Sequence, residues 1–266
     1  MVVFPNIKIN LGLNILSRRE DGYHNISSVF YPLPFTDILE ILPDNDFSFV
    51  STGLPIPGNT EDNLIIKAYN LLKEAYKLPP VSIHLHKIIP MGAGLGGGSA
   101  DGAFTIKCLN QLFGLNLSTK TMEDYASRLG SDCPFFIENK PVLVEGTGNV
   151  FSEIELSLEG KYLILIYPEV HVSTAQAYSK VTPKQPEISI TDIIKNKPLS
   201  EWKNVLNNDF ENSVFQQFPS ISKVKNELYE AGATYSSMTG SGASVFGIFD
   251  KKPSMKLPNI IWEAQL

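Results

Sequence analysis

The chain has 266 residues, of which 43% are hydrophobic and 19% charged, as in ordinary globular proteins with a buried core. Its formal net charge of −6 at pH 7 disfavours nucleic acid or a membrane surface as a partner. Residues 1–16 lack the features of a signal peptide, and Cys108 and Cys133 form no paired-cysteine motif. The composition predicts a cytoplasmic protein with reduced thiols that binds no nucleic acid and no membrane. The oligomeric state does not follow from the composition; we expect a monomer or weak homodimer.

Hydrophobic periodicity predicts the elements of the first half of the chain. Residues 7–15 alternate strictly, which predicts a strand with Lys8 and Asn10 on its polar face. Further strands are expected over 37–42, 47–51 and 81–88, and helices over about 62–76 with Thr60 as its cap, after the glycine-rich run, and over about 122–129.

The second half begins after a turn-rich, acidic segment, residues 146–161, which predicts a domain boundary. We therefore expect one domain over 1–150 and a second over 151–266. The second half should hold a buried strand over 162–168, helices over 201–217 and 220–231, and a small-residue run over 236–249 that ends in a strand. Strands and helices are mixed throughout, which predicts the α/β (α+β) class.

The most unusual stretch is "PMGAGLGGGSADG", residues 90–102, with six glycines between Gly92 and Gly102. A close-packed turn needs only one or two glycines. A dinucleotide fingerprint fits the spacing but lacks the acidic residue about 20 positions further on. An anion-binding loop fits best, because glycines let backbone N–H groups approach phosphate oxygens at the start of a helix. The glycine pattern by itself does not identify the ligand of this loop.

Four segments in order resemble the GHMP kinase superfamily, which phosphorylates small-molecule hydroxyls with ATP. They are "KINLGLNILSRREDGYHNISSVF", "PMGAGLGGGS", "LGSDCPFF" and "MTGSGASVFGIF", and they span residues 8–249. The resemblance implies a two-domain fold, with the phosphate loop in the N-terminal domain and a ferredoxin-like C-terminal domain. The chain departs from the family after Phe249, where a longer closing helix is usual. The resemblance therefore does not predict the last element of the second domain.

The resemblance also implies a substrate. "DGYH" is typical of family members that phosphorylate the 2-hydroxyl of a cytidylylated methylerythritol, in the non-mevalonate isoprenoid pathway. Tyr23 would stack on the cytosine and His24 would hydrogen-bond it, while Thr174 and Tyr178 match the second part of the substrate site. The alternatives are a kinase of the homoserine or mevalonate type, which needs no stacking tyrosine, and a silent nucleotide-binding relative, which could lose Lys8 or Asp132.

The catalytic residues implied by the resemblance are Lys8 and Asp132. Asp132 would accept the proton of the attacking hydroxyl, and Lys8 would keep it ionised and stabilise charge on the transferred group. From the residues alone, Asp132 could equally be a helix cap and Lys8 a solvated lysine of an edge strand. Asn10 would orient the substrate. His84, His86 and His171 have no ligand-like partners and are expected to be structural.

The cofactors implied are ATP and Mg²⁺, for which the sequence identifies no protein ligand. Asn63 and Lys87 would lie near the adenine and ribose, and Gly240, Ser241 and Gly242 would approach the phosphates. The phosphates themselves would be wrapped by Pro90, Met91, Gly92, Ala93, Gly94, Leu95, Gly96, Gly97, Gly98 and Ser99.

Overall fold

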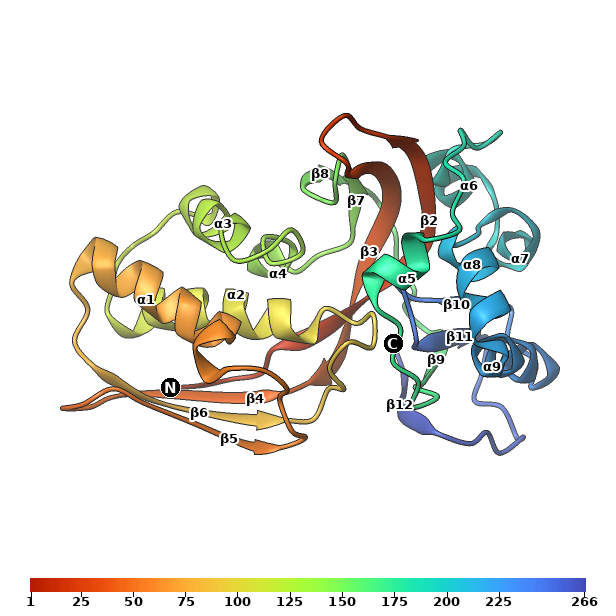
Figure 1. Cartoon of the computed structure of the whole chain (residues 1–266). Coiled ribbons are helices and arrows are strands. Elements are labelled where there is room, and N and C mark those ends of the chain that lie inside the picture. Colours follow the sequence, from red (N-terminus) through yellow and green to blue (C-terminus); the bar gives the residue numbers. More distant parts are fainter. The chain divides into compact units, whose positions relative to one another are not determined.

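The computed structural model describes all 266 residues, which form two compact units (Figure 1). Unit 1 comprises Met1–Lys8, Pro32–Met91 and Gly96–Lys140, and unit 2 comprises Ile9–Tyr31, Gly92–Leu95 and Pro141–Leu266. Because the units interleave along the chain, they do not decide the expected division into 1–150 and 151–266, which stays a prediction. None of the helices combines the length and apolar character that crossing a bilayer requires.

Unit 1 contains a four-stranded sheet covered on one face by helices. The strand order is β1 (Val2–Val3), β4 (Ile38–Pro43), β6 (Val81–Lys87) and β5 (Ser48–Gly53), with β5 parallel to β6 and the other pairs antiparallel. Helices α1 (Leu64–Tyr76) and α2 (Gly97–Leu112) lie over this sheet (Figure 1), with α3 (Thr119–Ser127) and α4 (Phe135–Glu138) packed on α2. Alternate residues of β4 and β6, such as Leu39, Ile41 and Ile83, are buried beneath the helices.

The predicted cap of α1 is wrong. The N-cap is Asn63, whose Oδ1 accepts a hydrogen bond from the N–H of Ile65 at 2.9 Å. Thr60 instead begins the short 3₁₀ helix η1 (Thr60–Asp62), whose last bond, from the Asn63 N–H, ends on the Thr60 carbonyl. An amide oxygen at Asn63 can reach the free N–H groups of the first turn, so the helix begins there. The other elements predicted in the first half are confirmed.

A second sheet has the order β2 (Asn6–Arg18), β3 (His24–Thr36), β7 (Val142–Glu145) and β8 (Val150–Glu153). The strand expected over 7–15 is confirmed as β2, but its polar face is not exposed: every residue from Asn6 to Ile15 is buried. Lys8 is only 4% exposed and Asn10 1%, so the alternative of a solvated edge lysine is wrong. Packing against both faces overrides what the alternation alone suggests.

Unit 2 contains an antiparallel sheet of β10 (Tyr235–Met238), β11 (Val245–Phe249), β9 (Tyr162–Ile166) and β12 (Ile260–Gln265), in that order. Helices α8 (Phe210–Gln217) and α9 (Pro219–Glu230) lie beside it (Figure 1). Strand β12 pairs with β9, so an edge strand closes the unit where the sequence left the last element open. The shorter elements are α5 (Thr174–Tyr178), α6 (Ile190–Asn196), η2 (Leu199–Glu201) and α7 (Trp202–Val205).

The single helix expected over 201–217 is wrong. It is divided into α7 and α8, with an interruption over 206–209. In the interruption Asn208 forms a β-bridge with Leu13, and its side chain bonds the carbonyls of Met238 and Gly240. These tertiary bonds replace the helical ones. The helix expected over 220–231 is confirmed as α9.

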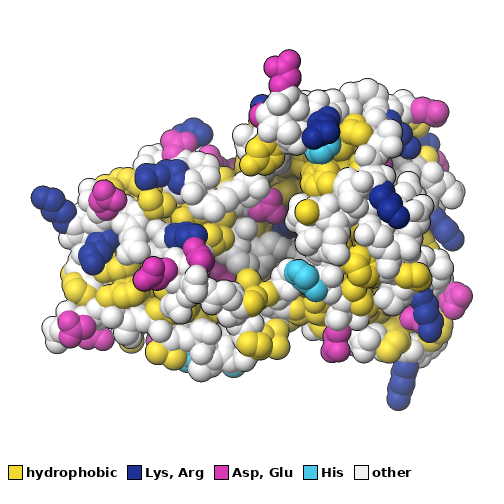
Figure 2. Space-filling view, viewed as in Figure 1, with side chains coloured by type: hydrophobic (Ala, Val, Ile, Leu, Met, Phe, Trp, Pro, Cys, Tyr) yellow, Lys and Arg dark blue, Asp and Glu magenta, His cyan; other side chains and the backbone are white.

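On the face shown in Figure 2, basic and acidic side chains are interspersed, with hydrophobic side chains between them. This mixture accords with the modest net charge of −6.

Candidate active site

Lys8 and Asp132 come together in unit 1. Lys8 Nζ lies 3.6 Å from Asp132 Oδ2, with the lysine side chain 5% exposed and the aspartate 30%. Burial lowers the pKa of Lys8 from its ordinary value, and the attraction and hydrogen bond of Asp132 partly offset this. Asp132 is not a helix cap, because α4 begins after Pro134 without any side-chain cap. A partly exposed carboxylate beside a buried ammonium can accept a proton from a hydroxyl that approaches from solvent.

The end of the glycine run packs directly on this pair. Gly96 is the N-cap of α2 and has a φ of 73°. A Cβ there would lie 3.0 Å from Phe136 Cζ and 3.3 Å from Lys8 Cγ. The first intrahelical bond of α2 is donated by Ala100 to the Gly96 carbonyl, so the preceding N–H groups are available to an anion.

In unit 2 the middle of the run meets the second small-residue segment. Gly94 has a φ of 78°, and a Cβ there would lie 2.2 Å from the Thr239 carbonyl oxygen. Thr239 Oγ1 donates to the Gly94 carbonyl at 3.2 Å, and a Cβ on Gly240 would lie 3.3 Å from Gly94 Cα. The structure thus brings the predicted segment 240–242 against the glycine loop. His171, expected to be structural, lies at the same place, since a Cβ on Gly92 would be 3.0 Å from its Nδ1.

Asn10 holds this second segment in place. Its Nδ2 donates to Ser28 Oγ at 2.8 Å, and its Oδ1 accepts from the N–H of Gly240 at 2.9 Å and from Thr239 Oγ1 at 3.2 Å. The side chain is therefore engaged within unit 2.

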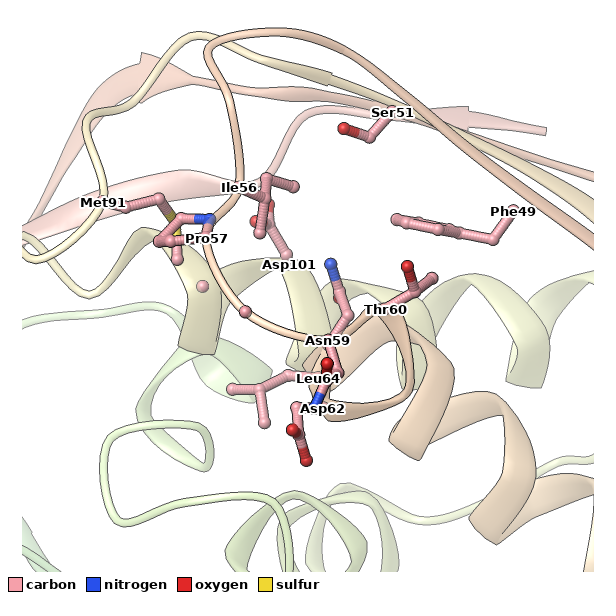
Figure 3. A pocket seen from close by; sticks show the side chains of 13 residues that line it. Phe49, Ser51, Ile56, Pro57, Asn59, Thr60, Asp62, Leu64, Met91 and Asp101 are labelled. Carbon is pink, nitrogen blue, oxygen red and sulfur yellow. The ribbon is translucent and has the colours of Figure 1, made fainter.

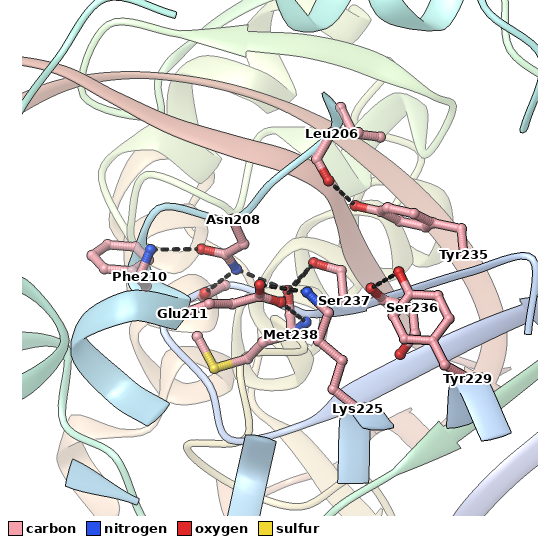
Figure 4. A network of polar contacts seen from close by, with 11 residues as sticks. Leu206, Asn208, Phe210, Glu211, Lys225, Tyr229, Tyr235, Ser236, Ser237 and Met238 are labelled. Atoms are coloured by element: carbon pink, nitrogen blue, oxygen red, sulfur yellow. Dashed lines mark hydrogen bonds and ion pairs between the residues drawn. The ribbon is translucent and has the colours of Figure 1, made fainter. Parts of the chain in front are cut away.

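A polar network that the sequence analysis missed supports the same segment (Figure 4). Asn208 Nδ2 donates to the carbonyls of Met238 at 2.8 Å and Gly240 at 2.9 Å. Glu211 Oε1 accepts from the N–H of Met238 at 2.9 Å, while its Oε2 pairs with Lys225 Nζ at 2.6 Å. Nothing in "LNNDFENS" indicates such a role, because these partners lie about 30 residues away.

Unit 1 also contains a cavity of about 370 Å³ beside the start and end of the glycine loop (Figure 3). Its walls include apolar side chains, polar groups of η1 and Asn63, whose expected place near the adenine and ribose stays a prediction. The lining residues are Phe49, Ser51, Ile56, Pro57, Gly58, Asn59, Thr60, Asp62, Asn63, Leu64, Met91, Gly98 and Asp101. Lys87 is not among them: its side chain is fully buried and pairs with Asp37 and Asp101.

The residues expected around a cytosine lie in unit 2. Tyr23 is 67% exposed, in a turn where Asp21 Oδ1 accepts its N–H at 3.1 Å. The ring of His24 stacks on Tyr178, with 4.6 Å between centroids and 19° between planes, so one face of Tyr178 is covered. Thr174 is the exposed first residue of α5.

The remaining candidates are structural in their contacts. His84 Nε2 and His86 Nδ1 each lie 2.9 Å from Thr52 Oγ1 on the outer face of the unit 1 sheet. Cys108 and Cys133 are free and buried. Burial raises their thiol pKa values, to about 11 for Cys108 and about 12 for Cys133, so neither is a thiolate near neutral pH.

The chain belongs to the GHMP kinase family. Residues 63–140 match the GHMP kinases N terminal domain, and residues 191–257 match the GHMP kinases C terminal domain. The 4-diphosphocytidyl-2-C-methyl-D-erythritol kinase of Parabacteroides distasonis is 52% identical to this chain over 100% of both sequences.

Solved structures agree with the family. A crystal structure of 4-(cytidine 5'-diphospho)-2C-methyl-D-erythritol kinase matches with a TM-score of 0.81 and 30% identity, over 93% of this chain and 90% of that one. A homoserine kinase from Cytophaga hutchinsonii matches with a TM-score of 0.65, over 93% of this chain and 86% of that one. At 20% identity the second match shows the shared fold alone. The expected two-domain GHMP kinase fold is confirmed.

Proposed function

We infer that this chain is an ATP-dependent kinase that phosphorylates the 2-hydroxyl of 4-(cytidine 5'-diphospho)-2-C-methyl-D-erythritol, in the non-mevalonate isoprenoid pathway. The full-length identity of 52% to a kinase of that name supports the substrate. The observation that carries the chemistry is the Lys8–Asp132 pair beside Gly96. The homoserine and mevalonate alternatives are not favoured, and a catalytically silent relative would have no need to keep this pair.

We propose that Asp132 accepts the proton of the substrate hydroxyl as the oxygen bonds to phosphorus. Its 30% exposure leaves room for the hydroxyl, and the ammonium of the neighbouring Lys8 lies 3.6 Å from its Oδ2. Lys8 would also stabilise negative charge on the transferred phosphoryl group, because its ammonium is buried and little screened. Phosphoryl transfer has a loose transition state, so positioning and charge supply most of the catalysis.

We propose that ATP binds through its phosphates to Pro90–Ser99 and through its adenosine in the cavity of unit 1. The positive φ angles of Gly92, Gly94 and Gly96 support the first part, since they turn successive N–H groups without Cβ clashes. The aromatic ring of Phe49 (Figure 3) supports the second part, and so does the polar Asn63, which also lines the cavity. Asn10 would act by holding Gly240 in place.

Mg²⁺ is the expected companion of ATP. No three His, Cys, Asp or Glu side chains come together to hold a metal ion, so the chain offers no cage of its own. We propose that Mg²⁺ is carried by the nucleotide phosphates, as this ion commonly is in kinases.

We propose that Tyr23, His24, Tyr178 and Thr174 bind the cytidine end of the acceptor. The exposure of Tyr23 supports stacking on a flat base, and the neighbouring His24 can hydrogen-bond the base edge. We further propose a cytoplasmic location and a monomer or weak homodimer.

The test is ADP release by the purified chain with Mg²⁺-ATP and one of three acceptors: the cytidylylated methylerythritol, mevalonate or homoserine, with a no-acceptor blank. Activity with the cytidylylated acceptor alone is expected. Activity with another alcohol would keep the kinase and overturn the cytidine site. Binding of ATP without turnover of any acceptor would favour the silent relative.

A further inference from the structure

A buried cluster of three charged side chains lies behind the phosphate loop in unit 1. Lys87 Nζ donates to Asp37 Oδ2 and, at 2.7 Å, to Asp101 Oδ2. The side chains of Lys87 and Asp37 are 0% exposed and that of Asp101 is 5% exposed. Three ionisable groups so completely removed from water are costly to keep, which indicates a role beyond stability.

The cluster is attached to both ends of the loop. Asp37 Oδ1 accepts the N–H groups of Ile88 at 2.5 Å and Ile89 at 2.9 Å, where the chain leaves β6 and the loop begins. Asp101 lies in α2, one turn after the loop ends. Lys87 joins the two carboxylates, so a single chain of ion pairs fixes the entry and the exit of the loop.

Gly97 brings the helix start close to this ammonium. A Cβ at Gly97 would lie 2.8 Å from Ile89 Cγ2 and 3.3 Å from Lys87 Nζ. The glycine thus allows the first turn of α2, whose N–H groups we propose to bind the phosphates, to approach the buried positive charge. Both act on an anion in the same direction, because the helix start is itself partly positive.

The single ammonium of the cluster can neutralise only one of its two carboxylates. Two carboxylates and one ammonium give a net charge of −1 when all are ionised. Asp101 Oδ1 is buried and has no hydrogen-bond partner, although it belongs to a residue that lines the nucleotide cavity. Burial raises the pKa of Asp101 to about 7; the Lys87 charge opposes this and the Asp37 charge adds to it.

No positively charged group other than Lys87 faces Asp101 to neutralise its carboxylate. Lys87 on β6 and Asp37 before β4 are the charged groups that face it. At the next residue, Gly102, the neighbours are apolar: Leu64 of α1 and Leu129, which follows α3. Asp62 is the other ionisable residue of the cavity wall, and it is exposed and paired with Lys67.

We propose that Asp37, Lys87 and Asp101 position the phosphate loop as one charged unit, and that this unit takes up a proton at Asp101 when the triphosphate binds. The proposal rests on the proposed function, because it takes ATP as the ligand of the loop. Several negative charges arriving beside a cluster of net charge −1 favour its neutral form, and a proton on Asp101 also lets its carboxyl act as a donor. Asp101 is thus a positioning residue whose protonation is linked to ATP affinity.

The experiment is calorimetric titration of the full chain with Mg²⁺-ATP, without acceptor, in buffers of different ionisation enthalpy at the same pH. The dependence of the measured heat on the buffer gives the number of protons taken up. With a pKa near 7 the wild-type chain should take up roughly half a proton at pH 7. Its ATP affinity should fall by up to about tenfold per pH unit above that.

Asp101→Asn keeps an acceptor for Lys87 and removes the titrating proton, so uptake and pH dependence should both be lost. The ionisation of ATP itself is the same in both titrations and cancels. Asp124→Asn, at an exposed aspartate of α3 outside both the cluster and the cavity, should keep the wild-type proton count. If Asp101→Asn does not fold, the wild-type uptake must instead vanish near pH 5.5, where Asp101 already carries its proton.

Equal proton counts for wild type and Asp101→Asn, or an unchanged wild-type count near pH 5.5, would overturn the inference while leaving ATP binding and the proposed function intact. A wild-type chain that binds no ATP would instead overturn the proposed function, and this inference with it.

Discussion

Lys8 Nζ lies 3.6 Å from Asp132 Oδ2, although 124 residues separate them along the chain. Gly96 packs against the stem of the same lysine, where a Cβ would lie 3.3 Å from Lys8 Cγ. A strand, a turn before a short helix and a helix N-terminus therefore meet at one buried ammonium. This arrangement brings the candidate base, its charge partner and the start of α2 together in unit 1.

Replacement of the candidate base should separate chemistry from binding. Asp132→Asn should lower turnover by roughly 10²-fold or more, because general-base contributions are of that size. ATP affinity should change little, since no residue of the adenosine cavity is altered. Steady-state ADP release and calorimetric ATP binding measure the two effects. Asp124→Asn, on the exposed face of α3, is the matched control and should retain turnover; wild-type turnover in Asp132→Asn would remove this residue from the mechanism.

Deprotonation of Lys8 should cause a loss of activity at high pH. Burial lowers its pKa below the ordinary value of 10.5, so the ammonium is lost earlier than in a solvated lysine. Turnover should decline as pH rises through the lowered pKa. The folded chain binds fewer protons than the unfolded chain between that pKa and 10.5, so the contribution of Lys8 to stability rises with pH there. Lys8→Arg, which stays charged, should abolish the high-pH decline in residual activity; a decline that persists would assign it to another group.

Gly94 should tolerate no side chain. Its φ of +78° is strained for other residues, and a Cβ would lie 2.2 Å from the Thr239 carbonyl oxygen. Gly94→Ala should cost more than about 2 kcal/mol of unfolding free energy, through strain and overpacking together. Gly114 has a φ of +58° and open space around it, so Gly114→Ala should cost only about 1 kcal/mol. Equal losses in urea denaturation would show that the contact with Thr239 is unimportant.

Asn208 should stabilise the segment 238–240, which packs against Gly94. Asn208→Ala removes its bonds to the Met238 and Gly240 carbonyls and to the N–H of Phe210. The loss should be about 2–4 kcal/mol of unfolding free energy, at about 1 kcal/mol for each bond. Asn70→Ala on the exposed face of α1 should stay within about 0.5 kcal/mol. A comparable effect at both positions would mean that the network adds no stability.

Tyr23 should affect one substrate only. Tyr23→Ala should raise KM for the cytidylylated acceptor by about 5- to 150-fold, as expected for a lost base–aromatic stack of about 1–3 kcal/mol. KM for ATP should stay unchanged. Tyr76→Ala, at a partly exposed tyrosine of α1, is the control and should leave both constants unchanged. A parallel rise in both KM values in Tyr23→Ala would indicate a folding defect instead of a cytidine contact.

The sequence alone predicts much of this protein, because several of its signals are local. The strict alternation over 7–15 predicts β2, and the glycine run before a helical pattern predicts the anion-binding loop and α2. The family resemblance, carried by short motifs, identified Lys8 and Asp132, which the structure brings together. The roles expected for these two residues, and for Thr174 and Tyr178, stay predictions.

The tertiary structure decided what depends on distant partners. Hydrophobic periodicity predicts which residues share one face of a strand, but it does not show which other elements pack on that face. It therefore could not reveal that the polar face of β2 is buried. The interruption at Asn208 exists because its hydrogen-bond partners lie 30 residues away, and the closing strand β12 because β9 offers it an edge. The expected place of Lys87 near the nucleotide stays a prediction, but only the fold shows that Lys87 joins Asp37 to Asp101, since a buried ammonium must find carboxylates wherever the fold places them.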